Sequence, residues 1–122
     1  MIVGIQGTSS FDDYNVFLRA MGVAMSSMSD DDTSLYIYSA GPARINSMLS
    51  EFTNLSERGF KSRGKRIKSY KVPPSWIEEN LESINYFAYF SKPKESVSKL
   101  VSSAQLKNID VGIYRYWGNN DN

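Results

Sequence analysis

Two short turns rich in glycine and hydroxyl side chains carry the residues best suited to chemistry in this chain. Each turn directly follows an apolar run. Their members are Gly7, Thr8, Ser9, Ser10, Gly41 and Arg44. Backbone N–H groups and hydroxyls donate hydrogen bonds to phosphate oxygens, glycine lets the backbone come close, and arginine can bind a phosphate with two parallel bonds. We therefore expect these turns to bind a phosphorylated, nucleotide-like small molecule.

A third turn adds a cation and two more hydroxyls. It follows the aromatic-rich run 84–90 and contains Ser91, Lys92 and Ser96, and Lys92 is a reasonable anion contact. Asn46 is a weaker candidate. The same residues also have structural interpretations, since Ser10 can cap a helix and Arg44 can be a surface side chain after a turn.

The absent residue types limit the possible chemistry. With no histidine and no cysteine, the chain cannot form a Ser–His triad, a cysteine nucleophile, a Cys/His zinc site or a disulfide. Asp12 and Glu51 can act as bases, but neither has a spaced partner, so the catalytic residues are unknown and enzymatic activity is left open. The run 30–32 is three aspartates without the pattern of a calcium loop. We interpret it as a solvated turn and expect no metal and no cofactor.

A basic run gives the strongest case for nucleic acid. Its cations are Lys61, Arg63, Lys65, Arg66 and Lys68. Interleaved with Phe60 and Tyr70, they can follow a phosphate backbone while the rings stack on bases. The alternative is a solvated loop and an edge strand whose lysines prevent pairing with other chains.

Alternating periodicities position these turns. Short apolar runs predict strands at 2–6, at 34–38, within 60–72, at 84–90 and at 111–114. Helical spacing and capping patterns predict helices at about 11–28, 42–59, 75–81 and 93–108. The capping patterns begin at Ser10 and Ser75, and Asn108 is expected to end the last helix in a left-handed conformation.

This alternation predicts an α/β fold. We expect one Rossmann-like three-layer domain over residues 1–117, with a five-stranded parallel sheet in the order 3-2-1-4-5 and a flexible tail at 118–122. The switch point then lies between the first and fourth strands, where parallel sheets place their ligand. No apolar run is long enough to span a bilayer and no signal peptide precedes the first strand, so we expect a cytoplasmic protein without a membrane partner.

Three segments carry a resemblance to a known family. They are Ile-Val-Gly-Ile-Gln-Gly-Thr-Ser-Ser-Phe at 2–11, Tyr-Ser-Ala-Gly-Pro-Ala-Arg-Ile-Asn at 38–46, and 96–100 with Ala104 ahead of Ile-Asp-Val at 109–111. The chain resembles small members of the SLOG superfamily, such as LOG, DprA-like and YpsA-like proteins. The resemblance implies a Rossmann-like fold, a nucleotide-derived ligand and dimers. Three departures stand out: Ala40-Gly41 replaces a Gly-Gly pair, Lys94-Glu95-Ser96 stands where a Gly-Thr is expected, and the Pro-Gly-Gly-x-Gly-Thr-x-x-Glu signature of LOG-type phosphoribohydrolases is absent.

Macromolecular partners form the alternative to a small ligand. The small size and the Ser-, Asn- and Lys-rich surface also resemble a bacteriophage accessory protein, which acts in the host cytoplasm and binds a host or viral macromolecule. The aromatic residues expected as interface anchors are Tyr86, Tyr89, Tyr114, Tyr116 and Trp117. A methionine stripe on the first helix, Met21, Met25 and Met28, is wider than one sheet face covers and favours a homo-oligomer.

Overall fold

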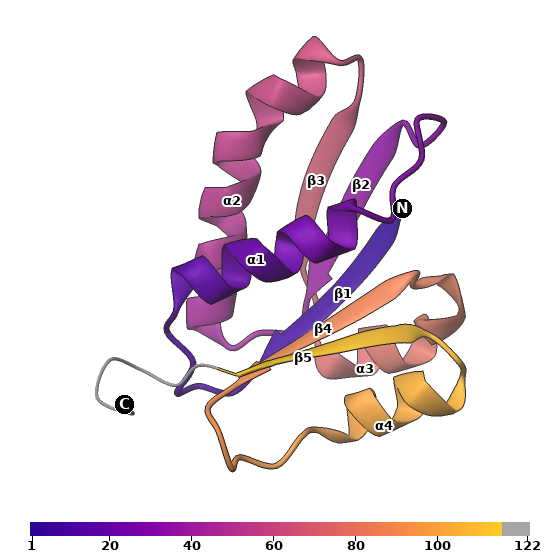
Figure 1. Cartoon of the computed structure of the whole chain (residues 1–122). Coiled ribbons are helices and arrows are strands. Elements are labelled where there is room, and N and C mark those ends of the chain that lie inside the picture. The colour runs from indigo at the N-terminus through magenta and orange to yellow at the C-terminus, as the bar shows by residue number, and fades with distance from the viewer. Residues whose placement is uncertain (116–122) are drawn as a thin grey trace.

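The described residues form one parallel sheet with helices on both faces, an α/β Rossmann-like fold (Figure 1). The computed structural model describes residues 1–115. The strands are β1 (Ile2–Gly7), β2 (Ser34–Ser39), β3 (Arg66–Lys71), β4 (Tyr86–Ser91) and β5 (Asp110–Arg115). Their order is β3-β2-β1-β4-β5 and every neighbouring pair is parallel, so the predicted topology is confirmed. The predicted tail at 118–122 lies outside the described residues.

Helices cover the two faces of the sheet unequally. Their bounds are α1 (Tyr14–Met25), α2 (Ala43–Ser62), α3 (Pro74–Glu79) and α4 (Lys99–Leu106), with a short 3-10 helix, η1 (Leu81–Ser83), after α3. One buried cluster joins α1 and α2 to one face, and a second cluster joins α3 and α4 to the other. In Figure 1, α3 and α4 both lie on the β4–β5 side of the sheet, while β2 and β3 extend away from them.

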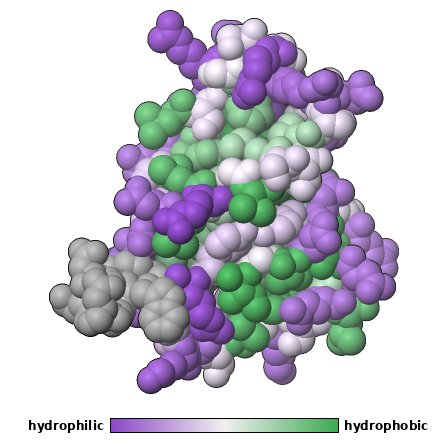
Figure 2. Space-filling view, viewed as in Figure 1, coloured by the Kyte–Doolittle hydropathy of each residue, from purple (hydrophilic) through white to green (hydrophobic). Residues whose placement is uncertain are grey.

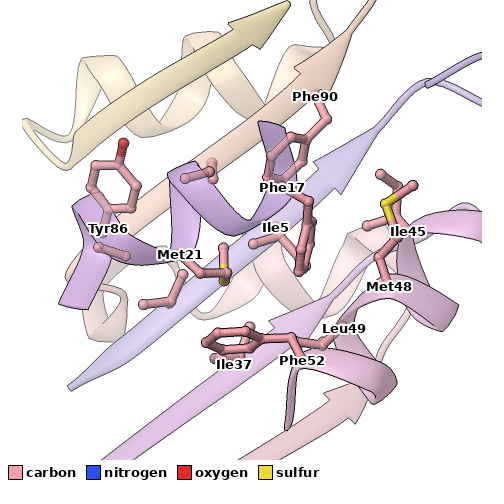
Figure 3. Packing of buried hydrophobic residues seen from close by; sticks show 14 of the residues in the cluster. Ile5, Phe17, Met21, Ile37, Ile45, Met48, Leu49, Phe52, Tyr86 and Phe90 are labelled. Carbon is pink, nitrogen blue, oxygen red and sulfur yellow. The ribbon is translucent and has the colours of Figure 1, made fainter. Parts of the chain in front are cut away.

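The larger cluster packs aromatic rings against aliphatic strand residues. Phe17 of α1 and Phe90 of β4 are fully buried, with ring centroids 5.3 Å apart. Figure 3 shows them beside Ile5 of β1, with Phe52 of α2 below. Burial of such side chains contributes about 2–3 kcal/mol each, so this packing stabilises the carboxyl end of β4, where Phe90 lies, against α1.

Two helices begin later than the sequence predicted. Asp13, which accepts the Val16 N–H at 3.1 Å, caps α1, so the cap predicted at Ser10 is wrong. Helix α4 begins at Lys99 instead of position 93, because Lys94 has a left-handed backbone (φ 70°) that breaks a helix. Both loops after β1 and β4 are therefore longer than expected.

Among the other predicted helix ends, some are wrong and one is confirmed. Helix α3 is capped by Pro73, so the cap predicted at Ser75 is wrong. Helix α2 continues past the predicted end at Gly59 to Ser62. Asn108 has φ 60°, which confirms the predicted left-handed position. Residues Asp30 and Asp31 form the predicted turn.

The methionine stripe of α1 packs inside its own domain. Met21 is fully buried, and Met25 and Met28 lie half-buried against the same cluster. The apolar side chains that α1 exposes are Leu18 and Val23. In Figure 2 the apolar patches of this view are separated by polar side chains. A neighbouring element of the same chain thus covers the stripe, which removes the reason it offered for expecting an oligomer.

Candidate functional site

The loops after β1, β2 and β4 meet at the predicted switch point. The Gly7 N–H donates to the Gly41 carbonyl at 3.0 Å, and the Thr8 N–H donates to the Phe90 carbonyl at 2.8 Å. A side chain at Gly7 would place its Cβ 2.8 Å from that carbonyl oxygen of Phe90, so only glycine fits there. The structure therefore brings the three predicted turns together in one place, which we call the carboxyl-end site.

The backbone donors of this site are already used. The N–H groups of Gly7 and Thr8 bond to the neighbouring loops, and the Gly41 N–H donates to the Ser39 hydroxyl at 3.1 Å. Gly41 is buried with φ 87°, so its glycine meets a backbone requirement and not a close approach to a ligand. In this structure these three N–H groups are bonded within the chain, and the expectation that they bind a phosphate stays a prediction.

A carboxylate of the chain itself accepts hydrogen bonds from the hydroxyl donors of the site. Glu95 accepts hydrogen bonds from Thr8 Oγ1 at 2.9 Å, from Ser10 Oγ at 2.8 Å and from the Lys92 N–H. The Lys92 N–H and then the Ser10 hydroxyl lower the pKa of Glu95 below its ordinary value. The donors of two loops therefore converge on one anion, and that anion belongs to the protein.

Arg115 holds the loop that carries Glu95. Its Nη1 donates to Ser91 Oγ at 3.1 Å, to the Lys92 carbonyl at 3.0 Å and to the Glu95 carbonyl at 3.1 Å. Ser91 is fully buried, and its hydroxyl accepts this hydrogen bond from Arg115. Arg115 stands beside Ser91 in the β4–β5 register, which explains how the end of the last strand fixes the loop.

The remaining predicted ligand contacts lie on the surface. Arg44 forms an ion pair with Asp12 (3.4 Å), in which both side chains are about half exposed, so the pair adds little stability. Lys92 is exposed, and within residues 1–115 it forms no ion pair. Ser9 and Ser96 are exposed as well. These groups border the site without contacting Glu95 through their side chains.

Sequence reasoning missed several polar contacts here. The buried Ser39 hydroxyl donates to Asn46 Oδ1, and Ser98 Oγ donates to Gln6 Oε1. Glu95 and Arg115 were missed because their partners, apart from the Lys92 N–H, lie 20 to 87 positions away. The only local signal was an acid three residues after Lys92, the spacing at which a side chain can return to a backbone N–H.

The residues of the basic run lie at the end of α2, in the turn that follows it and on β3. Phe60 is buried, and the Arg63 guanidinium lies 5.1 Å from its ring. Lys65 Nζ donates weakly to the Ser29 carbonyl at 3.4 Å. The exposed side chains at Arg66 and Lys68 share one sheet face, because residues two apart in a strand point the same way. Lys61 is exposed at the end of α2.

The aromatic anchors expected from the sequence are largely internal. Tyr86 and Tyr89 are buried and Tyr114 is half-buried, with the Tyr86 and Tyr114 hydroxyls bonded to each other. Burial is the main cause that raises the pKa of Tyr86. Tyr116 and Trp117 lie outside the described residues. The buried pair is core structure and offers no interface.

Comparison with protein-family models, with curated proteins and with solved structures finds no match for the chain. The fold and the site therefore define its class, a Rossmann-like α/β domain with an internally occupied carboxyl-end site. Within residues 1–115, no group of three acidic side chains is placed to hold a metal ion. No helix in that range is long and apolar enough to cross a membrane. A polar hollow of about 310 Å³ lies at the opposite, amino ends of the strands, between Asp32, Asn85 and Asp110.

Proposed function

We propose that the carboxyl-end site binds a small phosphorylated ligand whose anion replaces the carboxylate of Glu95. One observation carries the proposal: donors from the loops after β1 and β4 converge on a single carboxylate. Hydroxyl and backbone N–H donors bind phosphate oxygens as they bind carboxylate oxygens. The position also supports it, since parallel sheets bind ligands at this switch point.

Displacement of Glu95 is chemically feasible. The carboxylate is partly exposed and lies in a loop, and the charge of the exposed Lys92 already acts on it, which helps to lower its pKa. Arg44 would exchange its surface pair with Asp12 for the ligand, which costs little. A ligand that binds must offset the lost hydrogen bonds of Glu95, so the native site discriminates against weak anions.

The nucleotide character of the ligand follows only from the resemblance to SLOG proteins. Four other statements are also proposals: the SLOG resemblance itself, a bacteriophage origin, a location in the host cytoplasm and the formation of homo-oligomers. The exposed Leu18 and Val23 of α1 would give an oligomer interface only a small apolar surface. A macromolecular partner is the alternative function. It is favoured by a different surface, the uncovered half of the sheet, and is argued below.

The test is thermal unfolding with inorganic phosphate, AMP and ADP-ribose. We expect Glu95→Ala to be stabilised by at least one of these compounds more strongly than the wild type, because its hydroxyl donors are free. The double variant Glu95→Ala/Thr8→Val should lose that gain. Glu57→Ala is the matched control, since Glu57 is an exposed acid on α2 away from the site. A folded Glu95→Ala protein that responds to no compound would refute the proposal.

A further inference from the structure

Half of one sheet face has no helix packed over it. Helices α3 and α4 lie on the β4–β5 side (Figure 1), and α3 meets β2 through Trp76, which stacks on Tyr38 with centroids 4.2 Å apart. Side chains alternate along β2 and β3, so Leu35, Ile37 and Ile67 are buried in the cluster under α2, while the opposite set is half-buried on β2 and exposed on β3. The solvent-facing surface, here the open face, consists of Tyr36, Tyr38, Arg66, Lys68, Tyr70 and Trp76.

Four aromatic rings form a continuous row on the open face. Tyr70 lies 6.4 Å from Tyr36 and 4.9 Å from Tyr38, and Tyr38 stacks in turn on Trp76. Tyr70 is 41% exposed, although a ring of its size is normally buried. Tyr38 is stacked between Tyr70 and Trp76, so the exposed ring of Tyr70, with the half-buried ring of Tyr36 beside it, is the aromatic surface that nucleic acid bases can reach.

Two cations stand beside these rings. Lys68 is the register neighbour of Tyr36, and Arg66 precedes it by two positions on the same side of β3. Neither forms an ion pair among the residues described. The pKa of Tyr36 is lowered, mainly by a hydrogen bond with Ser34 and then by Arg66, which indicates that the guanidinium lies against the phenol. Cationic and aromatic side chains therefore lie side by side on the open face.

Protection of an edge strand explains only part of this surface. Lysine and arginine on β3 discourage pairing with other chains. That role does not require rings on the same face, and a row of four neighbouring rings, three from β2 and β3 and one from α3, exceeds what edge protection uses. A partner with flat aromatic units spaced along an anionic chain matches both features, and single-stranded nucleic acid has that chemistry.

We propose that the open face binds single-stranded nucleic acid. Bases stack on Tyr36 and Tyr70, and Arg66 and Lys68 bind the flanking phosphates. Lys61 and Arg63 lie at the end of α2, which packs against the opposite face of the sheet, and they are not part of this site. This site is on a different part of the sheet from the carboxyl-end site and does not depend on a ligand there.

The experiment measures fluorescence anisotropy of labelled oligo-U and oligo-dT, about 12 nucleotides long, over a range of salt concentrations. We expect Tyr70→Ala to weaken binding by about 5-fold to 150-fold, while Tyr70→Phe, which keeps the ring, binds as the wild type does. Arg66→Ala/Lys68→Ala should lower the salt slope by about 1.4, two phosphate contacts. The matched control is Arg19→Ala/Arg58→Ala, which removes two exposed cations from α1 and α2.

Each possible outcome decides the question. Binding that needs the ring and the two cations but not Arg19 and Arg58 supports the proposal, and a difference between the two oligomers identifies RNA or DNA as the target. Absence of wild-type binding at low salt overturns it. So does equal binding of a glutamate peptide of the same length, or a control double variant as weak as the test pair. Tyr70→Leu replaces Tyr70→Ala if the alanine variant unfolds, because leucine retains apolar contact with Tyr38.

Discussion

The carboxyl-end site and the open face differ in how far their polar groups are satisfied within the chain. At the carboxyl-end site, Glu95 takes three donors and Arg115 takes three acceptors. On the open face, Arg66 and Lys68 have no acidic partner within the described chain. A ligand at the first site must break the hydrogen bonds of Glu95, whereas a ligand at the second meets cations that have no acidic partner among residues 1–115, of which Arg66 is hydrogen-bonded to Tyr36.

This difference shows that position in a fold and readiness to bind are separate properties. The switch point of a parallel sheet gathers loop ends whatever their sequence, and here the loops use their donors on one another. The open face has no such conventional role, yet it leaves rings and charges exposed. Its cations therefore retain more of their electrostatic attraction for an external anion than Arg44, which is paired with Asp12.

The largest expected effect concerns the core beneath the carboxyl-end site. Phe90 is fully buried, with ring centroids 5.1 Å from Phe11 and 5.3 Å from Phe17. Phe90→Ala should lower the free energy of unfolding by about 3–5 kcal/mol through a cavity. Tyr70→Ala on the open face should cost about 1 kcal/mol, because the ring is partly exposed. Chemical denaturation of both variants measures the contrast.

Equal losses in the two variants would contradict this comparison. They would mean that the row of rings is a second core and not a surface. Tyr70→Phe is the control, since it removes only the hydroxyl and should keep wild-type stability on either interpretation.

A smaller expected effect is the pH dependence of stability, which tests the role of the Glu95 carboxylate. Its folded pKa is lowered, so its contribution to stability is present at neutral pH, above the unfolded value of about 4.3, and is lost as pH falls through the folded pKa. Wild type should therefore be more stable than Glu95→Gln at about pH 7, with the difference shrinking as pH falls through the folded pKa of Glu95. Urea midpoints at several pH values provide the measurement.

Glu57→Gln tests whether this pH dependence belongs to the site. Glu57 is exposed on α2, and its replacement should change the midpoint equally little at all pH values. A Glu95→Gln deficit that persists unchanged into acid would show that the carboxylate charge is not what the donors bind. The carboxyl-end site would then be a packing contact.

The sheet could be predicted from local sequence because each strand is a short apolar run between turn residues. Runs such as Ile2 to Gln6 and Leu35 to Tyr38 need no distant information to be recognised. Parallel order then followed from alternation with helices, since crossovers are right-handed. Helix starts were less accurate, because Ser10 and Asp13 are equally good caps in sequence and only the turn at Phe11, whose N–H bonds to the Thr8 carbonyl, decides between them.

The contents of the site depended on contacts that sequence does not reveal. The three turns were expected together and do meet, yet Glu95 reaches Thr8 across 87 positions. The open face had a readable signal that was overlooked. Tyr36 and Tyr38 are two apart in one strand, and Lys68 and Tyr70 are two apart in the next, which places all four on one face once the register is known.

The smallest expected effect tests the charge of the open face through Tyr36. A hydrogen bond with Ser34 is the largest cause of its lowered pKa, followed by the hydrogen bond and charge of Arg66. The same face contains Tyr38, whose pKa is raised by burial first and by the neighbouring phenols second. Tyr36 should consequently ionise below about pH 10 and before Tyr38.

Subtracting the ultraviolet titration of Tyr36→Phe from that of the wild type isolates the signal of Tyr36. Arg66→Ala should move this signal back toward the ordinary value by a fraction of the total shift, since the Ser34 bond remains, and Arg19→Ala should leave it in place. Low salt is required, because exposed charges are screened within about 10 Å at about 0.1 M salt. A Tyr36 that titrates at or above the ordinary value in the wild type would mean that Arg66 and Lys68 create no local positive potential, and the contrast between the two regions would be lost.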